Sequence, residues 1–542
     1  MMGTQTAIDF APLAVLLPIF GAALAFVLRR HVLAQRSVTI GALVVTLGLE
    51  AWMLVSAWQN GAQAVMIGGW APPFGISMVV DEFSALMLVV STAVSLTVLL
   101  YATGQGMADG DEDGPISVFH PAYLILVAGV SNAFLAGDLF NLYVGFEILL
   151  TASYVLLTLG GTTARIRAGV TYVVVSVVSS VLFLVAIGMI YAATGTVNMA
   201  DLALKLADID PGTQMVLHVM LLVAFGVKAA VFPLSFWLPD SYPTAPAPVT
   251  AVFAGLLTKV GVYAMIRTET LLFPGDRLNT ALMIVALLTM LVGILGALAQ
   301  ADFKRMLSFT LTSHIGYMVF GLATGSVVAL AATVYYVAHH IIVQTSLFLV
   351  AGLMERRGGT SNVDRLGSLA KLSPVLAVLF FVPAMNLAGI PPFSGFLGKL
   401  GLLRGGVDLG TPLAWVLLAG ALLTSLLTLL AVARVWNRAF WRRADDAEDP
   451  DPILLITADG GTHPVTGKAV AVAATRPAGR SEHDLLPRTM IHSTGALVLL
   501  GVSLTIFAGP LFDLADQAAQ QMMERTPYIE AVLGGTDAGG GS

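Results

Sequence analysis

Stretches of about 20 mostly apolar residues recur along nearly the whole chain, and they are apolar on every side. A helix with one apolar face is typical of a soluble protein, whereas a helix that is apolar all round belongs in a membrane or a deep core. Lipid offers the backbone no hydrogen-bond partners, so these runs must form helices. The pattern predicts an all-α polytopic membrane protein with about 14 transmembrane helices, near residues 8–28, 37–58, 81–103, 119–136, 138–158, 169–193, 214–240, 246–270, 279–299, 304–322, 328–354, 373–403, 411–435 and 488–510.

The composition agrees with this prediction. Of 542 residues, 57% are hydrophobic and 11% are charged, whereas soluble proteins carry about 25% charged residues. The chain has no cysteine, which excludes disulfides, thiolate metal sites, iron–sulfur clusters and cysteine nucleophiles. No metal or cofactor is expected. The first apolar run is followed by Arg29 and Arg30 and not by a small-residue cleavage site, so we interpret it as the first span.

Lysine and arginine are unevenly divided between the two sides of the membrane. With the N-terminus outside and fourteen alternating spans, the cytoplasmic segments hold nineteen basic residues and the outer segments hold five. Basic residues are enriched in cytoplasmic loops, so both termini are expected to face outward. Residues 436–487, rich in Pro, Gly, Asp and Ala, are then expected to form a flexible cytoplasmic loop.

Three lysines lie inside predicted spans, where a lysine costs roughly 2.5–3.5 kcal/mol at the helix centre. Lys228 and Lys259 are far from either interface, so a partner or a wet cavity is expected for each. Lys399 lies only five residues before Arg404, and the residues alone also allow its side chain to reach the interface. These lysines are the first candidates for a transport function.

Glu147 is interpreted as the only acid deep in a span. A buried carboxylate needs either a proton or a cationic partner, and Lys228 is the natural candidate for that partner. Asp138, nearer the membrane edge, is interpreted as a helix N-cap.

Histidines supply further candidates, because imidazole titrates near neutral pH and can pass on a proton. His339 and His340 are adjacent in one span, and neighbouring residues point about 100° apart on a helix, which argues against a shared metal ion. One of the two is expected to face a proton path. His314 is a possible relay residue or a satisfied polar core residue, and His218 is interpreted as structural.

Prolines interrupt two of the spans that carry lysines. Pro233 follows Lys228, and Pro391 and Pro392 precede Lys399. Proline removes a backbone donor, and in lipid the freed carbonyl groups need protein or water partners. Interrupted helices in corresponding positions of two halves indicate inverted repeats, here spans 4–8 and 9–13. Simple proline kinks are the alternative.

Several segments carry a family resemblance at this point, among them VKAAVFPLSFWLPDSYPTAPAPVTAVFAGLLTKVGVYAMIR, YYVAHHIIVQTSLFLVAG and NLAGIPPFSGFLGKLGLL. They resemble the antiporter-like subunits shared by respiratory complex I, membrane-bound hydrogenases and Mrp multisubunit Na⁺/H⁺ antiporters, over nearly the whole chain. Within that superfamily, AGDLFNLYVGFE and the ending YIEAVLGG are most similar to the Mrp D subunit.

The resemblance implies a fold with two inverted five-helix repeats and broken helices 7 and 12. It divides the chain into helices 1–3, the first repeat (helices 4–8), the second repeat (helices 9–13), a cytoplasmic loop, and helix 14 with an outward tail, at residues 1–118, 119–270, 279–435, 436–487 and 488–542. The family's functional residues fall on Glu147, Lys228, Lys259, His339 or His340, and Lys399. Many relatives have a lysine where this chain has Gln344.

The implied function is stepwise proton transfer along these side chains, in a subunit of a hetero-oligomeric Mrp complex that exchanges protons for Na⁺ or Li⁺ across a bacterial plasma membrane. Such a subunit is a secondary transporter and not an enzyme. The alternatives are a proton-pumping subunit of complex I or of a membrane-bound hydrogenase, a self-sufficient transporter, and a scaffold without transport. Gene neighbourhood would separate the first alternative, and activity on expression alone would separate the second.

Overall fold

The computed structural model describes residues 7–106, 118–450, 454 and 486–534. Twelve helices among these residues are long and apolar enough to cross a membrane, and two shorter apolar helices, α4 and α16, complete the fourteen expected crossings. The crossing segments are α1 (Leu13–Val27), α2 (Val32–Asn60), α3 (Glu82–Gln105), α4 (Phe119–Leu135), α5 (Leu139–Thr158), α6 (Thr163–Thr194), α8 (Pro211–Ala229), the run α10 (Ala247–Val252), η6 (Phe253–Leu257), α11 (Thr258–Arg267) and η7 (Thr268–Leu272), α12 (Asn279–Leu298), α13 (Phe303–Ala323), α14 (Val327–Gly358), α16 (Pro374–Ala388) with α17 (Ser394–Leu409), α18 (Pro412–Val435) and α20 (Arg488–Ile506).

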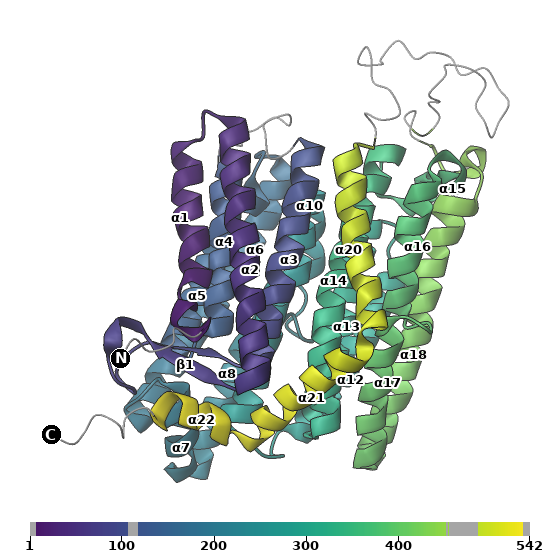
Figure 1. Ribbon diagram of the computed structural model, residues 1–542. Coiled ribbons are helices and arrows are strands. Elements are labelled where there is room, and N and C mark those ends of the chain that lie inside the picture. The colour runs from purple at the N-terminus through teal and green to yellow at the C-terminus, as the bar shows by residue number, and fades with distance from the viewer. Residues whose placement is uncertain (1–6, 107–117, 451–453, 455–485, 535–542) are drawn as a thin grey trace.

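Short elements close the two ends of the bundle. β1 (Gln63–Met66) and β2 (Ser77–Val80) form an antiparallel hairpin in which Gln63 pairs with Val80. This hairpin lies with α7 (Met199–Lys205) at the base of Figure 1, while α15 (Leu369–Leu372) lies at the top. The remaining helical turns are η1 (Ala7–Phe10), η2 (Ile67–Gly69), η4 (Leu206–Asp208), α9 (Leu238–Ser241), η5 (Tyr242–Thr244), η8 (Val363–Arg365), η9 (Trp436–Trp441) and η10 (Ala444–Asp446).

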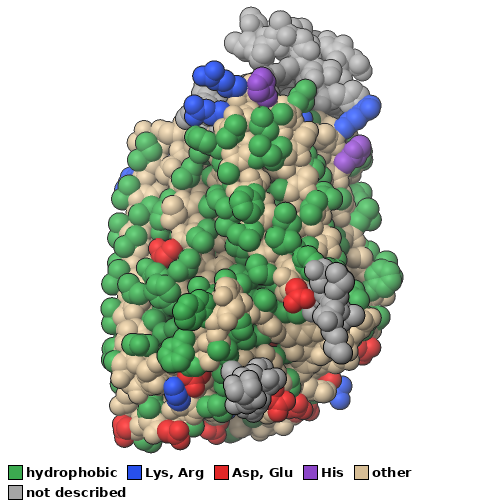
Figure 2. Space-filling model, turned by 60° about the vertical axis from the view of Figure 1, so that its left-hand side comes forward, with side chains coloured by type: hydrophobic (Ala, Val, Ile, Leu, Met, Phe, Trp, Pro, Cys, Tyr) green, Lys and Arg blue, Asp and Glu red, His purple; other side chains and the backbone are tan. Residues whose placement is uncertain are grey.

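The surface matches a lipid-facing bundle. Figure 2 shows apolar side chains over the flank of the molecule, basic side chains gathered at the upper end, and mostly acidic ones at the lower end. Large side chains such as Leu422, Leu426 and Leu499 are more than half exposed. A soluble protein rarely exposes so large an apolar surface, so this flank is the surface that contacts lipid or partner subunits.

Two sets of five helices repeat the same local features. α6 and α14 both contain 32 residues and start 164 residues apart. The main-chain bridge between Asp138 and Asn198 recurs, 164 residues on, between Asp302 and Asn362. Each aspartate accepts a bond from the backbone of the helix that follows, so Asp138 is the predicted N-cap. The first bridge adjoins the β hairpin at the base and the second leads to α15 at the top, so the sets have opposite orientations (Figure 1).

Both predicted interruptions lie in the helices that carry lysines. α8 ends before Ala230, whose φ of 58° is left-handed, and the chain passes Pro233 before it is helical again at α9. α16 ends before Gly389, whose φ is 83°, and Pro391 and Pro392 occupy the turn before α17. Left-handed backbone is a common way to end a helix, so each break leaves carbonyl groups of a half-helix without an intrahelical partner.

One expectation for the C-terminal region needs correction, and the structure adds detail to another. The predicted loop 436–487 begins later than expected, because η9 continues α18 as a π-helix to Trp441; residues 451–453 and 455–485 lie outside the described residues. The expected tail is helical over α21 (Ala508–Glu524) and α22 (Thr526–Leu533), which run across the base in Figure 1. The buried residues of α21 share one face with helical spacing, at Leu514, Ala515, Ala518, Ala519 and Met522.

Candidate functional site

Lys228 lies at the end of α8, directly before the first helix break. Its side chain is 8% exposed. Its Nζ donates to Ser180 Oγ of α6 at 3.0 Å and lies 4.8 Å from the centre of the Phe146 ring. The hydroxyl and the ring face both stabilise a buried ammonium group. A cavity of about 20 Å³ adjoins Lys228, Ser176 and Trp237 and has room for a water molecule.

Glu147 lies one residue from Phe146, but it does not pair with Lys228 as the sequence predicted. No ion pair of the described residues joins the two, although Glu147 is close enough to act on the charge of Lys228. Glu147 is only partly buried, and its Oε1 has no hydrogen-bond partner in the described part of the chain. The two groups are therefore near neighbours without a direct contact.

Lys259 is fully buried beside a distortion of its own helix. Residues 253–257 form a π-helix, which widens the turn and removes regular i to i−4 hydrogen bonds. Lys259 Nζ donates to the carbonyl oxygen of Ala254, inside that π-helix, at 2.6 Å. π-bulges occur frequently at functional sites. The sequence predicted a buried lysine here but not the π-helix that receives its ammonium group.

His314 and His340 stack in the centre of the bundle. Their ring centres are 5.1 Å apart, and both side chains are fully buried. His314 Nδ1 bonds with the hydroxyl of Tyr336 at 2.6 Å, while neither ring nitrogen of His340 has a hydrogen-bond partner among the described residues. His314 is therefore part of the cluster, and the sequence had left its role open.

His339 points from α14 to the second break. Its Nδ1 bonds with Ser394 Oγ at 2.9 Å, and Ser394 donates to Asn386 Oδ1 at 3.2 Å. The centres of the His339 and Tyr336 rings are 5.2 Å apart. His339 and His340 thus point in different directions, as expected for adjacent helical residues, yet both are buried in the polar cluster.

The side chain of Lys399 does not extend to the membrane interface, which excludes the alternative that the residues alone had allowed. The side chain is 5% exposed, and its Nζ donates to the carbonyl oxygens of Leu387 and Ala388, each at 3.1 Å. These carbonyl groups end α16, where the helix dipole also favours a cation. The Nζ lies 4.9 Å from the centre of the Tyr317 ring. The second break therefore binds the ammonium group of Lys399 directly.

Gln344 occupies the position where many relatives have lysine. It is fully buried, its Nε2 donates to the carbonyl oxygen of Leu307 at 2.7 Å, and its Oε1 has no hydrogen-bond partner among the described residues. A neutral amide therefore lies one helical turn from His340 in place of a charged group.

The structure also places a second acid in the interior. Glu50 of α2 is fully buried, and Ser131 Oγ donates to its Oε1 at 3.2 Å. The sequence analysis interpreted Glu147 as the only acid deep in a span, and Glu50 shows that this interpretation was wrong. Glu50 lies about as deep in its predicted span, 37–58, as Glu147 lies in 138–158, so the hydropathy pattern alone could have identified it.

Comparison with known proteins agrees with this architecture. The family described as NADH:quinone oxidoreductase/Mrp antiporter, TM, matches residues 136–427. The D subunit of the Na(+)/H(+) antiporter of Alkalihalophilus pseudofirmus is 38% identical over 96% of this chain and 98% of its own length. A chain of the Mrp complex from Dietzia sp. DQ12-45-1b superposes with a TM-score of 0.85 at 32% identity, over 98% of this chain and 100% of that one. A chain of the archaeal membrane-bound sulfane sulfur reductase superposes with a TM-score of 0.82 at 25% identity, over 97% of this chain and 100% of that one.

The fourteen crossings, the two broken helices and the buried lysines define a polytopic membrane subunit of the antiporter class. More specifically, the chain belongs to the NADH:quinone oxidoreductase/Mrp antiporter family. Its curated relatives at 35–38% identity over nearly the full chain are Na⁺/H⁺ antiporter D subunits.

Proposed function

We propose that this chain is the proton-translocating subunit of a hetero-oligomeric Na⁺(Li⁺)/H⁺ antiporter. One observation carries the proposal: buried titratable side chains extend from the first helix break, across the centre of the bundle, to the second break. The proposed relay consists of Glu147, Lys228, Lys259, His339, His340 and Lys399, with His314 as a further member. Na⁺/H⁺ antiport is the activity in the names of the D-subunit relatives.

The three lysines of the relay each have a hydroxyl or carbonyl partner that can release the ammonium group. An ammonium group that leaves its carbonyl or hydroxyl partner in an apolar setting loses its proton more readily. Neutral imidazole carries one donor and one acceptor nitrogen, so each of the two rings can accept a proton on one nitrogen and release it from the other. The carbonyl groups at the two breaks can accept hydrogen bonds from water inside the membrane.

The proposed orientation places both termini outside the cell, in a bacterial plasma membrane. The support is the division of basic residues, nineteen on one side and five on the other. In this orientation the end with the β hairpin, α7, α21 and α22 faces outward (Figure 1).

Transport by the full complex in everted vesicles tests the relay. Lys259→Ala removes the fully buried ammonium group, and we expect sodium-dependent collapse of a pH gradient to fall roughly 100-fold, the usual contribution of a positioned acid–base group. Lys205→Ala, which removes an exposed lysine of α7 outside the spans, is the matched control. Normal exchange by Lys259→Ala, with co-purification of the other subunits, would remove Lys259 from the relay.

A redox-driven proton pump is the second candidate, and the similarity to the sulfane sulfur reductase favours it. The relay chemistry would be the same, but the partners would differ. Purification of the native complex with identification of its subunits separates the two candidates. Small antiporter subunits support the first, and quinone-reductase or hydrogenase subunits support the second.

A further inference from the structure

His218 and Glu269 form a buried pair outside the proposed relay. His218 Nε2 and Glu269 Oε1 are 2.5 Å apart, and the two residues are 4% and 9% exposed. The imidazole stacks on Phe273, with ring centres 4.5 Å apart and an interplanar angle of 9°. The sequence interpretation had left His218 as structural, and Glu269 lies near the end of a span, so neither residue indicated this pair.

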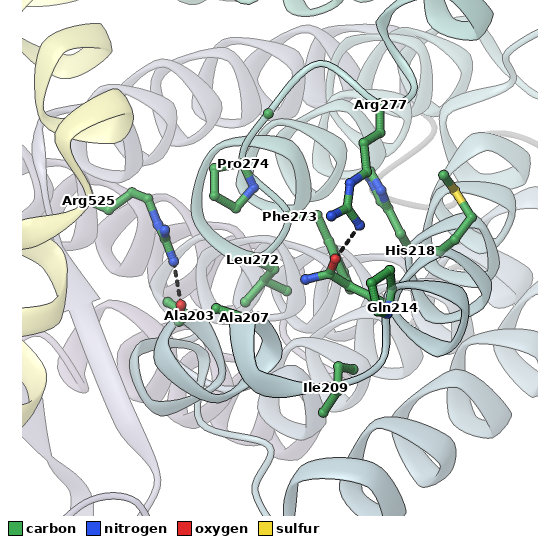
Figure 3. Close-up of a pocket in the computed structure, with 13 residues that line it drawn as sticks. Ala203, Ala207, Ile209, Gln214, His218, Leu272, Phe273, Pro274, Arg277 and Arg525 are labelled. Atoms are coloured by element: carbon green, nitrogen blue, oxygen red, sulfur yellow. Dashed lines mark hydrogen bonds between the residues drawn. The ribbon is translucent and has the colours of Figure 1, made fainter.

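The pair separates two cavities at the end of the bundle that carries α7. His218 lines a cavity of about 230 Å³ with Gln214, Arg277 and Arg525, shown in Figure 3. Glu269 lines a second cavity of about 370 Å³ with Asp276. Each cavity has room for several water molecules. The short hydrogen bond therefore joins two spaces that water can enter, with the imidazole on one side and the carboxylate on the other.

The same two helices carry the pair and two relay lysines. His218 and Lys228 are ten residues apart on α8, and Glu269 is ten residues from Lys259 on the run from α10 to η7. Ten helical residues span about 15 Å. The helices pack closely, because a Cβ on Gly261 would lie 2.7 Å from the backbone nitrogen of Ala229. The pair thus joins the two helices that carry Lys228 and Lys259, about 15 Å along each helix from its lysine.

The charged groups around the pair are arranged asymmetrically. On the imidazole side, Arg277 donates to Gln214, and Arg525 donates to the carbonyl oxygen of Ala203 at 2.5 Å (Figure 3). Burial lowers the pKa of Arg525. On the carboxylate side lies Asp276.

Two residues before Glu269 on the same helix run, Arg267 forms an ion pair with Asp81, 2.5 Å away. Because Asp81 pairs with Arg267, Glu269 is left to accept the hydrogen bond from the imidazole of His218.

We propose that the His218–Glu269 pair is a proton-exchange site at the mouth of the relay, and this inference rests on the proposed function. The imidazole takes a proton from water in the first cavity and passes its Nε2 proton to Glu269 Oε1. The carboxyl group then releases a proton to water in the second cavity, and both residues return to their starting charge. The cavity on each side gives the pair the contact with water that proton exchange requires.

The test uses His218→Gln and Glu269→Gln in the complete complex, measured in everted vesicles across a range of pH. Each variant keeps a hydrogen-bonding side chain but cannot exchange a proton. We expect sodium-dependent antiport to fall roughly 10- to 100-fold, most strongly at high pH, where protons are scarce. Asp201→Asn, which removes the ion pair with Lys205 at the same end, is the matched control and is expected to keep the rate and the pH profile.

Assembled glutamine variants with the wild-type rate and pH profile would overturn the inference. If the variants do not assemble, deuterium exchange at the imidazole carbon decides it in the wild-type complex. His218 is expected to exchange faster than the fully buried His120 and to show a pH-dependent rate. Exchange as slow as that of His120 overturns the site.

Lys259→Ala is measured in parallel. Loss of transport in that variant alone rejects only the exchange site, whereas normal transport by Lys259→Ala rejects the relay through Lys259 on which the exchange site depends.

Discussion

The ammonium group of Lys399 lies 3.1 Å from the carbonyl oxygen of Ala388, the last residue of the half-helix α16. Carbonyl groups at a helix end are normally bound by a cap or by water. Here the first turns of the next half-helix supply the partner, so the break in the backbone and the buried charge stabilise each other. The relay role of Lys399 can be tested without removing this contact.

Lys399→Arg is predicted to be inserted and assembled but to transport poorly, much like Lys399→Ala. Arginine can still bond to the carbonyl groups of Leu387 and Ala388. It stays protonated, since its pKa is above about 12, and a relay residue must lose its proton in each cycle. Sodium-dependent exchange in everted vesicles measures the effect. Near-normal exchange in an assembled complex would contradict the relay role of Lys399.

Glu147→Ala is predicted to abolish antiport while the protein remains in the membrane. The variant removes the carboxylate that acts on Lys228, but the hydrogen bond from Lys228 to Ser180 remains, so folding is preserved. A loss of roughly 100-fold is expected for a positioned proton-transfer group. Membrane content is measured in the same vesicles by immunoblot. Normal exchange at normal content would contradict the role of Glu147.

Gly389→Ala is predicted to impair both stability and transport. Gly389 has φ of 83°, and an added Cβ would lie 2.9 Å from Cδ of Lys399. A left-handed alanine costs of order 1 kcal/mol or more, and the lysine must also shift away from its carbonyl partners. Gly410→Ala, with φ of 64° but its nearest contact at 3.8 Å, is the matched control for backbone strain alone. Equal transport by the two variants would show that the contact between Gly389 and Lys399 does not affect transport.

The orientation is predicted to place residue 481 in the cytoplasm and residue 535 outside, both beyond the described residues. Cysteines introduced singly as Ser481→Cys and Gly535→Cys can be labelled specifically, because the native chain has none. An impermeant thiol reagent applied to intact cells is expected to label only the second. Labelling of the first from outside would reverse the proposed topology.

The fourteen crossings and the two interrupted helices were predictable because hydropathy and proline act locally. The same was true of Lys228, Lys259 and Lys399, which are anomalous in any apolar run. The partners of these lysines were not predictable, since Ser180, Ala254 and Ala388 are ordinary residues that become ligands only through packing.

The pairing of Glu147 with Lys228 was wrong as a direct contact for the same reason: a sequence reveals which charges need partners, but not which neighbour supplies them. The sequence of α21 has amphipathic spacing, but the segment is too polar to be identified by a pattern that selects membrane spans.

The C-terminal helices α21 and α22 have a mechanical consequence. α21 packs on α14 and α3, and α22 packs on α7 and on both strands of the hairpin. One continuous segment therefore straps the second helix set to the first across the base of Figure 1. Many transporters work by rocking one repeat against the other, and this strap opposes such a motion. The proposed relay needs no such rocking, because side chains and water can move a proton while the helices keep their positions.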